Sequence, residues 1–116
     1  MAKNSLAGVM WKQNELPGAR ALFEAVVEAR EAMDGGEAPD TLNAKSNLAT
    51  VMMYQGDLAG ARGLYEAVAE AKARRLGPRH AETLSTKYNL ATVMTEQGDL
   101  PGARVVYEAV AEAQAR

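Results

Sequence analysis

Apolar residues recur along this chain at helical spacing. In the middle of the sequence one apolar stripe predicts an amphipathic helix over residues 40–55, and a second predicts a helix over residues 57–75. Gly56 can adopt the left-handed conformation that ends a helix, and Asp57 can cap the helix that follows. The two stripes consist of Ala44, Leu48, Val51 and Met52, and of Leu58, Ala61, Leu64, Tyr65 and Val68. The pattern predicts an antiparallel helix pair with a very short turn.

The same pattern occurs three times. The block Lys-x-x-Leu-Ala-x-Val-Met begins at Lys3, Lys45 and Lys87, so the period is 42 residues without insertion or deletion. Residues 45–74 and 87–116 agree at 23 of 30 aligned positions, and residues 3–32 agree with residues 45–74 at 16 of 30. A period of this length indicates a stacked array, in which each unit buries its apolar face against its neighbours.

We therefore expect an all-α protein made of a single repeat array over residues 1–116. The three repeats are expected over about 1–38, 39–80 and 81–116, and the helices over 2–13, 15–33, 40–55, 57–75, 82–97 and 99–115. Gly18, Gly60 and Gly102 fall in the first turn of the second helix of each repeat, where a missing side chain permits close packing. Arg20, Arg62 and Arg104 each precede a Glu by four positions, which favours weak ion pairs on a solvated helix face.

Composition narrows the function classes. Apolar residues make up 47% of the chain but aromatic residues only 5%, and the abundant Ala predicts closely packed helices. The net charge of −2 disfavours a nucleic-acid partner. The chain has no cysteine, which excludes disulfides and thiolate chemistry, and it has no apolar run long enough for a membrane span. We expect a cytoplasmic protein without a membrane partner.

The repeats resemble the tetratricopeptide repeat, specifically the 42-residue type of kinesin light chains. The residues that carry this resemblance are Leu48-Ala49, Gly56-Asp57, Ala61, Tyr65 and the linker Leu76-Gly77-Pro78-Arg79-His80-Ala81-Glu82-Thr83-Leu84. The resemblance implies a right-handed α-solenoid of three antiparallel helix hairpins, whose concave wall of first helices holds extended peptides. The linker before the second repeat departs from the pattern at Asp34-Gly35 and Ala38, so we expect a looser first junction.

A polar stripe on the first helix of each repeat is the candidate binding surface. It consists of Asn43, Asn47, Thr50 and Tyr54 in the second repeat and of Ser85, Asn89, Thr92 and Glu96 in the third. In peptide-binding members of the family, an Asn at the place of Asn47 and Asn89 grips the ligand backbone. The first repeat has Ser5 there, which lacks the paired donor and acceptor of a carboxamide. An alternative is that both Asn side chains bond to a neighbouring helix or loop.

Catalytic and metal sites are not expected. His80 is the one histidine of the chain and lies in a linker beside Glu82, which favours a structural cap over a metal ligand or a general base. No phosphate-binding glycine motif is present. We expect no cofactor, no metal and no enzyme activity.

Three functions remain open. The first is an interaction scaffold that binds a peptide or protein partner on the concave face. The second is a self-assembling structural segment, since the terminal helices expose apolar stripes without a polar cap and favour self-association. The third is a sensor or regulatory fragment of a larger bacterial signalling protein. The near identity of the second and third repeats fits either a recent duplication or a segment designed or excised from a longer array.

Overall fold

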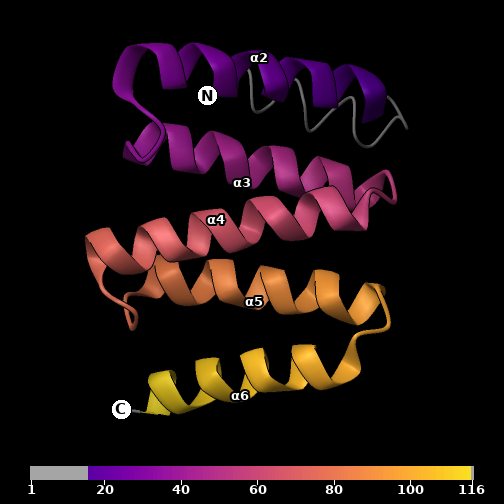
Figure 1. Cartoon of the computed structure of the whole chain (residues 1–116), viewed down its shortest axis with the longest axis vertical. Helices are drawn as coiled ribbons and strands as arrows, with labels where there is room; N and C mark the ends of the chain where they lie inside the picture. The colour runs from indigo at the N-terminus through magenta and orange to yellow at the C-terminus, as the bar shows by residue number, and fades with distance from the viewer. Residues whose placement is uncertain (1–15, 116) are drawn as a thin grey trace. The chain divides into compact units, whose positions relative to one another are not determined.

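The computed structural model describes residues 16–115 (Figure 1). This part of the chain is all α-helical, and its helices are α2 (Leu16–Asp34), α3 (Pro39–Tyr54), α4 (Leu58–Leu76), α5 (Ala81–Glu96) and α6 (Leu100–Ala115). Each of them begins and ends within one residue of the bounds expected from the sequence. The helix expected over residues 2–13 lies outside the described residues. The all-α class is confirmed.

The chain divides into two compact units, residues 1–57 and residues 58–116. In the first unit, α2 and α3 run antiparallel and pack against each other (Figure 1). Ala19 and Phe23 of α2 are buried, and α3 buries Leu42, Leu48 and Val51. The apolar stripe that predicted α3 is therefore the buried face of this helix.

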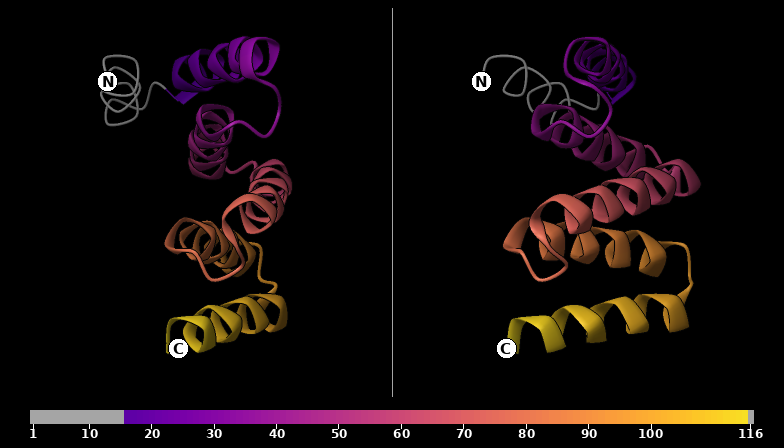
Figure 2. Two further views of the ribbon diagram at one scale, coloured as in Figure 1. Left: turned by 90° about the vertical axis from the view of Figure 1, so that its left-hand side faces the viewer. Right: turned by 60° about the vertical axis from the view of Figure 1, so that its left-hand side comes forward.

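In the second unit, α5 packs against both α4 and α6, and successive helices run antiparallel (Figure 2). Small side chains dominate the buried positions of this unit, as the alanine content predicted: Ala61 and Ala91 have no exposed surface. Tyr65, Val68 and Val93 are larger side chains of this unit that are also fully buried. The helices pack closely because few bulky residues separate them.

The three-residue turns after α3 and α5 end their helices in the same way. Gly56 has a φ of 86° and Gly98 a φ of 82°, a conformation that glycine adopts without steric cost. After α5, the Gly98 N–H donates to the Thr95 carbonyl at 3.0 Å, and the Asp99 N–H donates to the Met94 carbonyl at 2.9 Å. This pair of bonds satisfies carbonyls at the helix end that have no partner within the helix.

The aspartate of the turn then begins the next helix. Asp99 Oδ1 accepts a hydrogen bond from the Gly102 N–H at 3.1 Å, as expected of a capping carboxylate. A Cβ atom at Gly102 would lie 2.5 Å from Asp99 Oδ2 and 2.7 Å from Met94 Cε. The sequence predicted close approach of a neighbouring backbone at this glycine, but the nearest atoms belong to the Asp99 and Met94 side chains, so a larger residue would have to displace the cap.

The linker before α5 is held by side-chain contacts. His80 Nδ1 accepts a hydrogen bond from the Glu82 N–H at 3.1 Å, which caps the helix. The buried Thr83 hydroxyl donates to the Gly77 carbonyl at 2.9 Å. The structural role expected for His80 is confirmed.

The linker before α3 lacks both contacts. Ala38 occupies the capping position, and its methyl group cannot accept a hydrogen bond from the first turn of α3. Thr41 Oγ1 is buried and has no hydrogen-bond partner within the described residues. This linker is held instead by Lys45, whose Nζ atom lies 3.2 Å from the Gly36 carbonyl oxygen and 3.1 Å from Glu31 Oε2. The two linkers are thus held by different chemistry.

Candidate functional site

The polar stripe expected on α3 lies on the helix face opposite its buried residues. Asn43 and Tyr54 are exposed, and Asn47 and Thr50 are half-buried. The Thr50 hydroxyl donates to the Ser46 carbonyl at 3.0 Å, so it is engaged within its own helix. The carboxamide of Asn47 makes no hydrogen bond to any residue in the range 16–115.

The equivalent stripe on α5 is also open to solvent. Ser85, Asn89 and Glu96 are exposed, and the Asn89 carboxamide has no hydrogen-bond partner in the described part of the chain. Thr92 is half-buried: its hydroxyl donates to the Tyr88 carbonyl at 3.1 Å and lies 3.3 Å from the Tyr107 hydroxyl. Ser85, Asn89 and Glu96 thus present polar groups to solvent, whereas Thr92 ties α5 to α6.

An aromatic pair borders the α5 stripe. The rings of Tyr88 and Tyr107 meet edge to face, with their centroids 5.3 Å apart and an interplanar angle of 67°. Tyr88 remains about half exposed and offers apolar surface next to the polar residues. The sequence did not predict this pair, because Tyr107 belongs to the next helix.

A groove of about 470 Å³ adjoins the first half of the α5 stripe. Among its lining residues, Ser85 and Tyr88 come from α5, Arg79 from the preceding linker, and Ala113 and Gln114 from α6. Of the residues expected to bind a ligand, Ser85 alone lines it. The groove combines an aromatic wall with a cation and two neutral polar groups, which suits a ligand segment with an apolar and an acidic or amide side chain.

A second groove, of about 570 Å³, is elsewhere on the same unit. It is lined mainly by small apolar residues of α4 and α6, with Lys87 and Leu90 of α5. None of the residues expected to bind a ligand lines it. The larger of these two grooves and the expected peptide surface are therefore different places.

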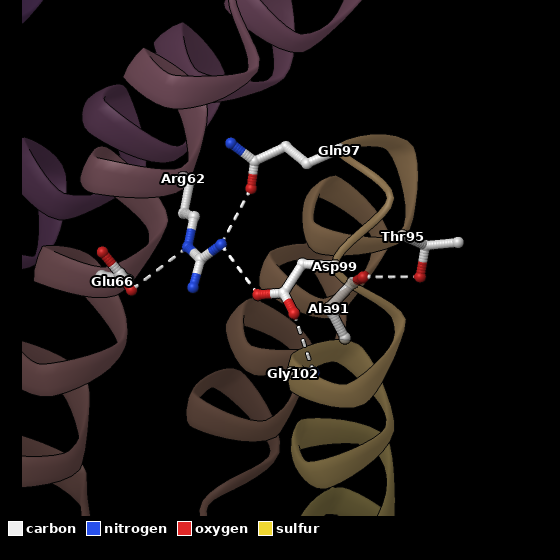
Figure 3. A network of polar contacts seen from close by, with 7 residues as sticks. All are labelled: Arg62, Glu66, Ala91, Thr95, Gln97, Asp99 and Gly102. Carbon is white, nitrogen blue, oxygen red and sulfur yellow. Dashed lines mark hydrogen bonds and ion pairs between the residues drawn. The ribbon is translucent and has the colours of Figure 1, made fainter.

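The repeated arginines have partners that the sequence did not indicate. Arg62 forms the expected pair with Glu66, with Nε and Oε2 3.5 Å apart, but its Nη1 atom also donates to Gln97 Oε1 at 2.9 Å and to Asp99 Oδ2 at 3.1 Å (Figure 3). Arg62 on α4 thus binds the turn between α5 and α6. The sequence predicted a solvated helix face here, whereas the Arg62 side chain is 30% exposed and bound to this turn.

Arg20 repeats this arrangement within the first unit. Its Nη1 atom donates to Gln55 Oε1 at 3.1 Å and to Asp57 Oδ2 at 3.2 Å, while its Nε pairs with Glu24 Oε2 at 3.3 Å. Each arginine therefore contacts residues 35 and 37 positions further along the chain. The signal was present in the sequence, because Gln-Gly-Asp recurs with the same 42-residue period as the arginine.

The described residues bring no metal site together. Within residues 16–115 there is no group of three or more His, Asp or Glu side chains that could hold an ion. In the same range no helix is both long and apolar enough to cross a membrane.

Sequence comparison finds tetratricopeptide repeats over most of the chain. One sequence model described as tetratricopeptide repeat matches residues 40–116, and a second with the same description matches residues 1–33. A search of curated proteins gave no match.

Solved structures of similar fold are kinesin light chain-like. Two crystal structures of a Podosopora anserina protein, described as a kinesin light chain with nearly identical TPR-like repeats, are 26% and 25% identical to this chain, each with a TM-score of 0.92 over 99% of it. The chain spans 54% and 55% of the length of those chains. BtubC (BKLC) from P. vanneervenii is similar in fold alone, with 21% identity and a TM-score of 0.86 over 95% of this chain and 43% of that one.

Proposed function

Because this chain belongs to the tetratricopeptide repeat family, we propose that it is an interaction scaffold that binds an extended peptide segment of a partner protein on the polar stripes of α3 and α5. Repeats of this family generally mediate protein–protein interaction. The observation that carries the finer proposal is the state of Asn47 and Asn89, whose carboxamides are unused within residues 16–115. A carboxamide offers one donor group and one acceptor, which is the complement of a peptide unit.

The affinity of such a site depends on more than the two amides. Each hydrogen bond contributes about 1 kcal/mol net, whereas micromolar binding requires about 8 kcal/mol. The remainder has to come from apolar burial, and the half-exposed ring of Tyr88 with the adjoining groove supplies a place for it. We propose micromolar binding of a peptide that places one side chain against Tyr88.

The proposal includes no catalytic step. The family's repeat is a non-catalytic scaffold, and the one histidine of this chain is engaged in capping α5. It stays a prediction that the α3 and α5 stripes together form one concave wall. The three repeat boundaries, the cytoplasmic location and the alternative role as a sensor or regulatory fragment also stay predictions.

The test is peptide-library binding with matched variants. Peptides selected on the native chain are titrated against Asn47→Ala, Asn89→Ala and the double variant, with Glu28→Ala as the control for loss of an exposed polar side chain on α2, outside the stripes and the groove. We expect each single variant to weaken binding about fivefold, the double variant about 30-fold, and the control to change nothing. Unchanged affinity in the double variant would remove the two asparagines from the site.

A further inference from the structure

The larger groove of the second unit has no part in the peptide site proposed above. It has a volume of about 570 Å³ and lies among α4, α5 and α6. Its apolar surface includes Leu90, Val105 and Val106, and Lys87 is the one cation among its lining residues. Val105 is 65% exposed, which is unusual for a valine side chain. The volume is within the range of known ligand sites, about 300–1,000 Å³.

The α6 side of this groove does not depend on which residues follow α6. Val105 and Ala109 of α6 correspond to Gly63 and Ala67 of α4 at the 42-residue spacing. Gly63 and Ala67 are exposed although α5 packs against α4. A helix of this chain therefore keeps this face open after the next helix has packed against it.

Lys87 lacks the contacts that its counterpart makes in the first unit. Lys45 Nζ lies 3.1 Å from Glu31 Oε2 and 3.2 Å from the Gly36 carbonyl oxygen. One period after Glu31 the chain has Ala73, which lines the groove together with Lys87. Lys87 is half-buried and makes no hydrogen bond or ion pair within residues 16–115.

The linker before α5 does not depend on this lysine. His80 and Thr83 hold that linker, whereas Lys45 holds the linker before α3. A half-buried ammonium group has lost part of its hydration, and a carboxylate is the acceptor that best compensates for this loss. Lys87 is therefore available to a ligand that supplies the carboxylate.

The two glutamates of the groove are already paired on their own helix. Glu66 Oε2 lies 3.5 Å from Arg62 Nε (Figure 3), and Glu70 Oε1 lies 3.7 Å from Arg74 Nη1. Each of these carboxylates has a guanidinium beside it, which offsets its repulsion of an anionic ligand. Lys87 is thus the one charged residue of the groove without an opposite charge in the described part of the chain.

We propose that this groove binds a segment of a partner protein that presents a glutamate between aliphatic side chains. The carboxylate binds Lys87 Nζ as the Glu31 carboxylate binds Lys45, and it occupies the space next to Ala73. The aliphatic side chains pack on the apolar surface that includes Val105. Apolar burial supplies most of the binding free energy, while the ion pair selects an acidic segment.

This site goes beyond the peptide binding proposed above, because none of the stripe residues lines the groove. The two sites are tested separately. The double variant Asn47→Ala with Asn89→Ala is expected to leave binding at the groove unchanged, and Lys87→Gln is expected to leave binding at the stripes unchanged. Failure of one proposal therefore does not imply failure of the other.

A pair of peptide libraries tests the chemistry of the groove. The first library consists of short peptides with blocked termini and a central Glu between randomised Leu, Ile, Val and Ala, and the second has Gln in place of Glu. Fluorescence polarisation measures binding to the whole chain. We expect peptides of the first library to bind, and a Gln in place of the Glu of a selected peptide to weaken binding about fivefold.

A double-mutant cycle assigns the carboxylate to its partner. Lys87→Gln is expected to weaken binding of the selected Glu peptide about fivefold and to leave binding of its Gln counterpart unchanged. Arg75→Gln removes a positive charge from an exposed residue of α4 that does not line the groove, so it should change neither affinity. Equal effects of Lys87→Gln on both peptides would overturn the proposal, as would a first library without any binder.

A glutamate placed inside the groove provides an independent test. Ala73→Glu gives the position of Ala73 the residue that the first repeat has there, so we expect it to pair with Lys87 and to weaken peptide binding at least tenfold. Ala67→Glu makes the same change at an exposed position of α4 outside the groove and should leave binding unchanged. Circular dichroism checks that both variants are folded. Undiminished binding by folded Ala73→Glu would also overturn the proposal, and if this variant does not fold, the cycle at Lys87 decides alone.

Discussion

Two threonines at identical positions of their repeats have different environments. Thr41 and Thr83 both begin a first helix and both are fully buried. The Thr83 hydroxyl donates to the Gly77 carbonyl at 2.9 Å, whereas Thr41 Oγ1 has no partner in the described part of the chain. A buried hydroxyl without a hydrogen bond loses its hydration and gains nothing in return. The same residue therefore stabilises one linker and not the other.

Replacement of each threonine by valine separates these effects. Thr83→Val removes the hydrogen bond to the Gly77 carbonyl, which keeps its bond from the His80 N–H at 3.3 Å, so we expect the free energy of unfolding to fall by about 1 kcal/mol. Thr41→Val removes an unsatisfied hydroxyl, so we expect no loss or a gain of a few tenths of a kcal/mol. Urea unfolding followed by circular dichroism measures both. Equal losses in the two variants would contradict the difference between the linkers.

The arginine series shows what could be predicted for single residues. The pairs with a glutamate four positions later followed from helical spacing, and the structure confirms them for Arg20, Arg62 and Arg104. The contacts of Arg20 and Arg62 with the next turn were not predicted, because they depend on how one helix packs against the next pair. Likewise, helical phase predicted that Asn47 and Asn89 avoid the buried face, but it could not show that Thr92 would be engaged by Tyr107.

At the scale of the helices, glycine positions decide where an element ends and where it is weakened. Gly98 ends α5 with a φ of 82°, which side chains with a Cβ rarely adopt. Gly63 lies inside α4, and an added Cβ there meets nothing within 4 Å. The third repeat has Val105 at the position of Gly63. One glycine is therefore required by the backbone, while the other only lowers helix propensity.

Alanine substitutions at the two glycines are expected to change stability in opposite directions. Gly98→Ala forces a Cβ into the left-handed conformation and should lower the free energy of unfolding by about 1 kcal/mol. Gly63→Ala should raise it by about 0.5–1 kcal/mol, because alanine restricts the unfolded chain and favours the helix. Thermal and urea unfolding of both variants provide the check, and a destabilised Gly63→Ala would show that α4 needs open space there.

For the whole molecule, the 42-residue period was the decisive signal. It predicted the all-α class and the bounds of α2 to α6, because an undisturbed period places equivalent turns at equivalent glycines. The period did not predict the grooves, because these form where side chains of several helices meet and where the repeats differ. Tyr88, for example, lines a groove, and its counterpart in the second repeat is Ser46. The fold therefore follows from what the repeats share, while the details of a binding surface follow from what they do not share.

The linker before α3 is one of the places where the repeats differ, and we predict that it limits the stability of the array. In a repeat protein the total stability is close to a sum of terms from single repeats and from neighbouring interfaces. Gly35 and Gly77 have similar φ angles of 91° and 104°, so the second linker can replace the first without a change of backbone at this position. The replacement consists of Asp34→Leu, Gly36→Pro, Glu37→Arg and Ala38→His.

We expect this replacement to raise the free energy of unfolding of the whole chain by about 1–2 kcal/mol. The new histidine caps α3, which is worth about 1 kcal/mol, and the proline restricts the unfolded chain by a further 0.4–1 kcal/mol, roughly. Loss of the exposed Arg30–Asp34 pair, now 3.5 Å apart, subtracts at most about 0.5 kcal/mol. The reverse exchange, with residues 34–38 placed at positions 76–80, should lower stability by a similar amount, because it removes the His80 cap. If urea unfolding showed no gain from the first exchange and a loss from the second, the missing cap at Ala38 would not be what weakens this linker.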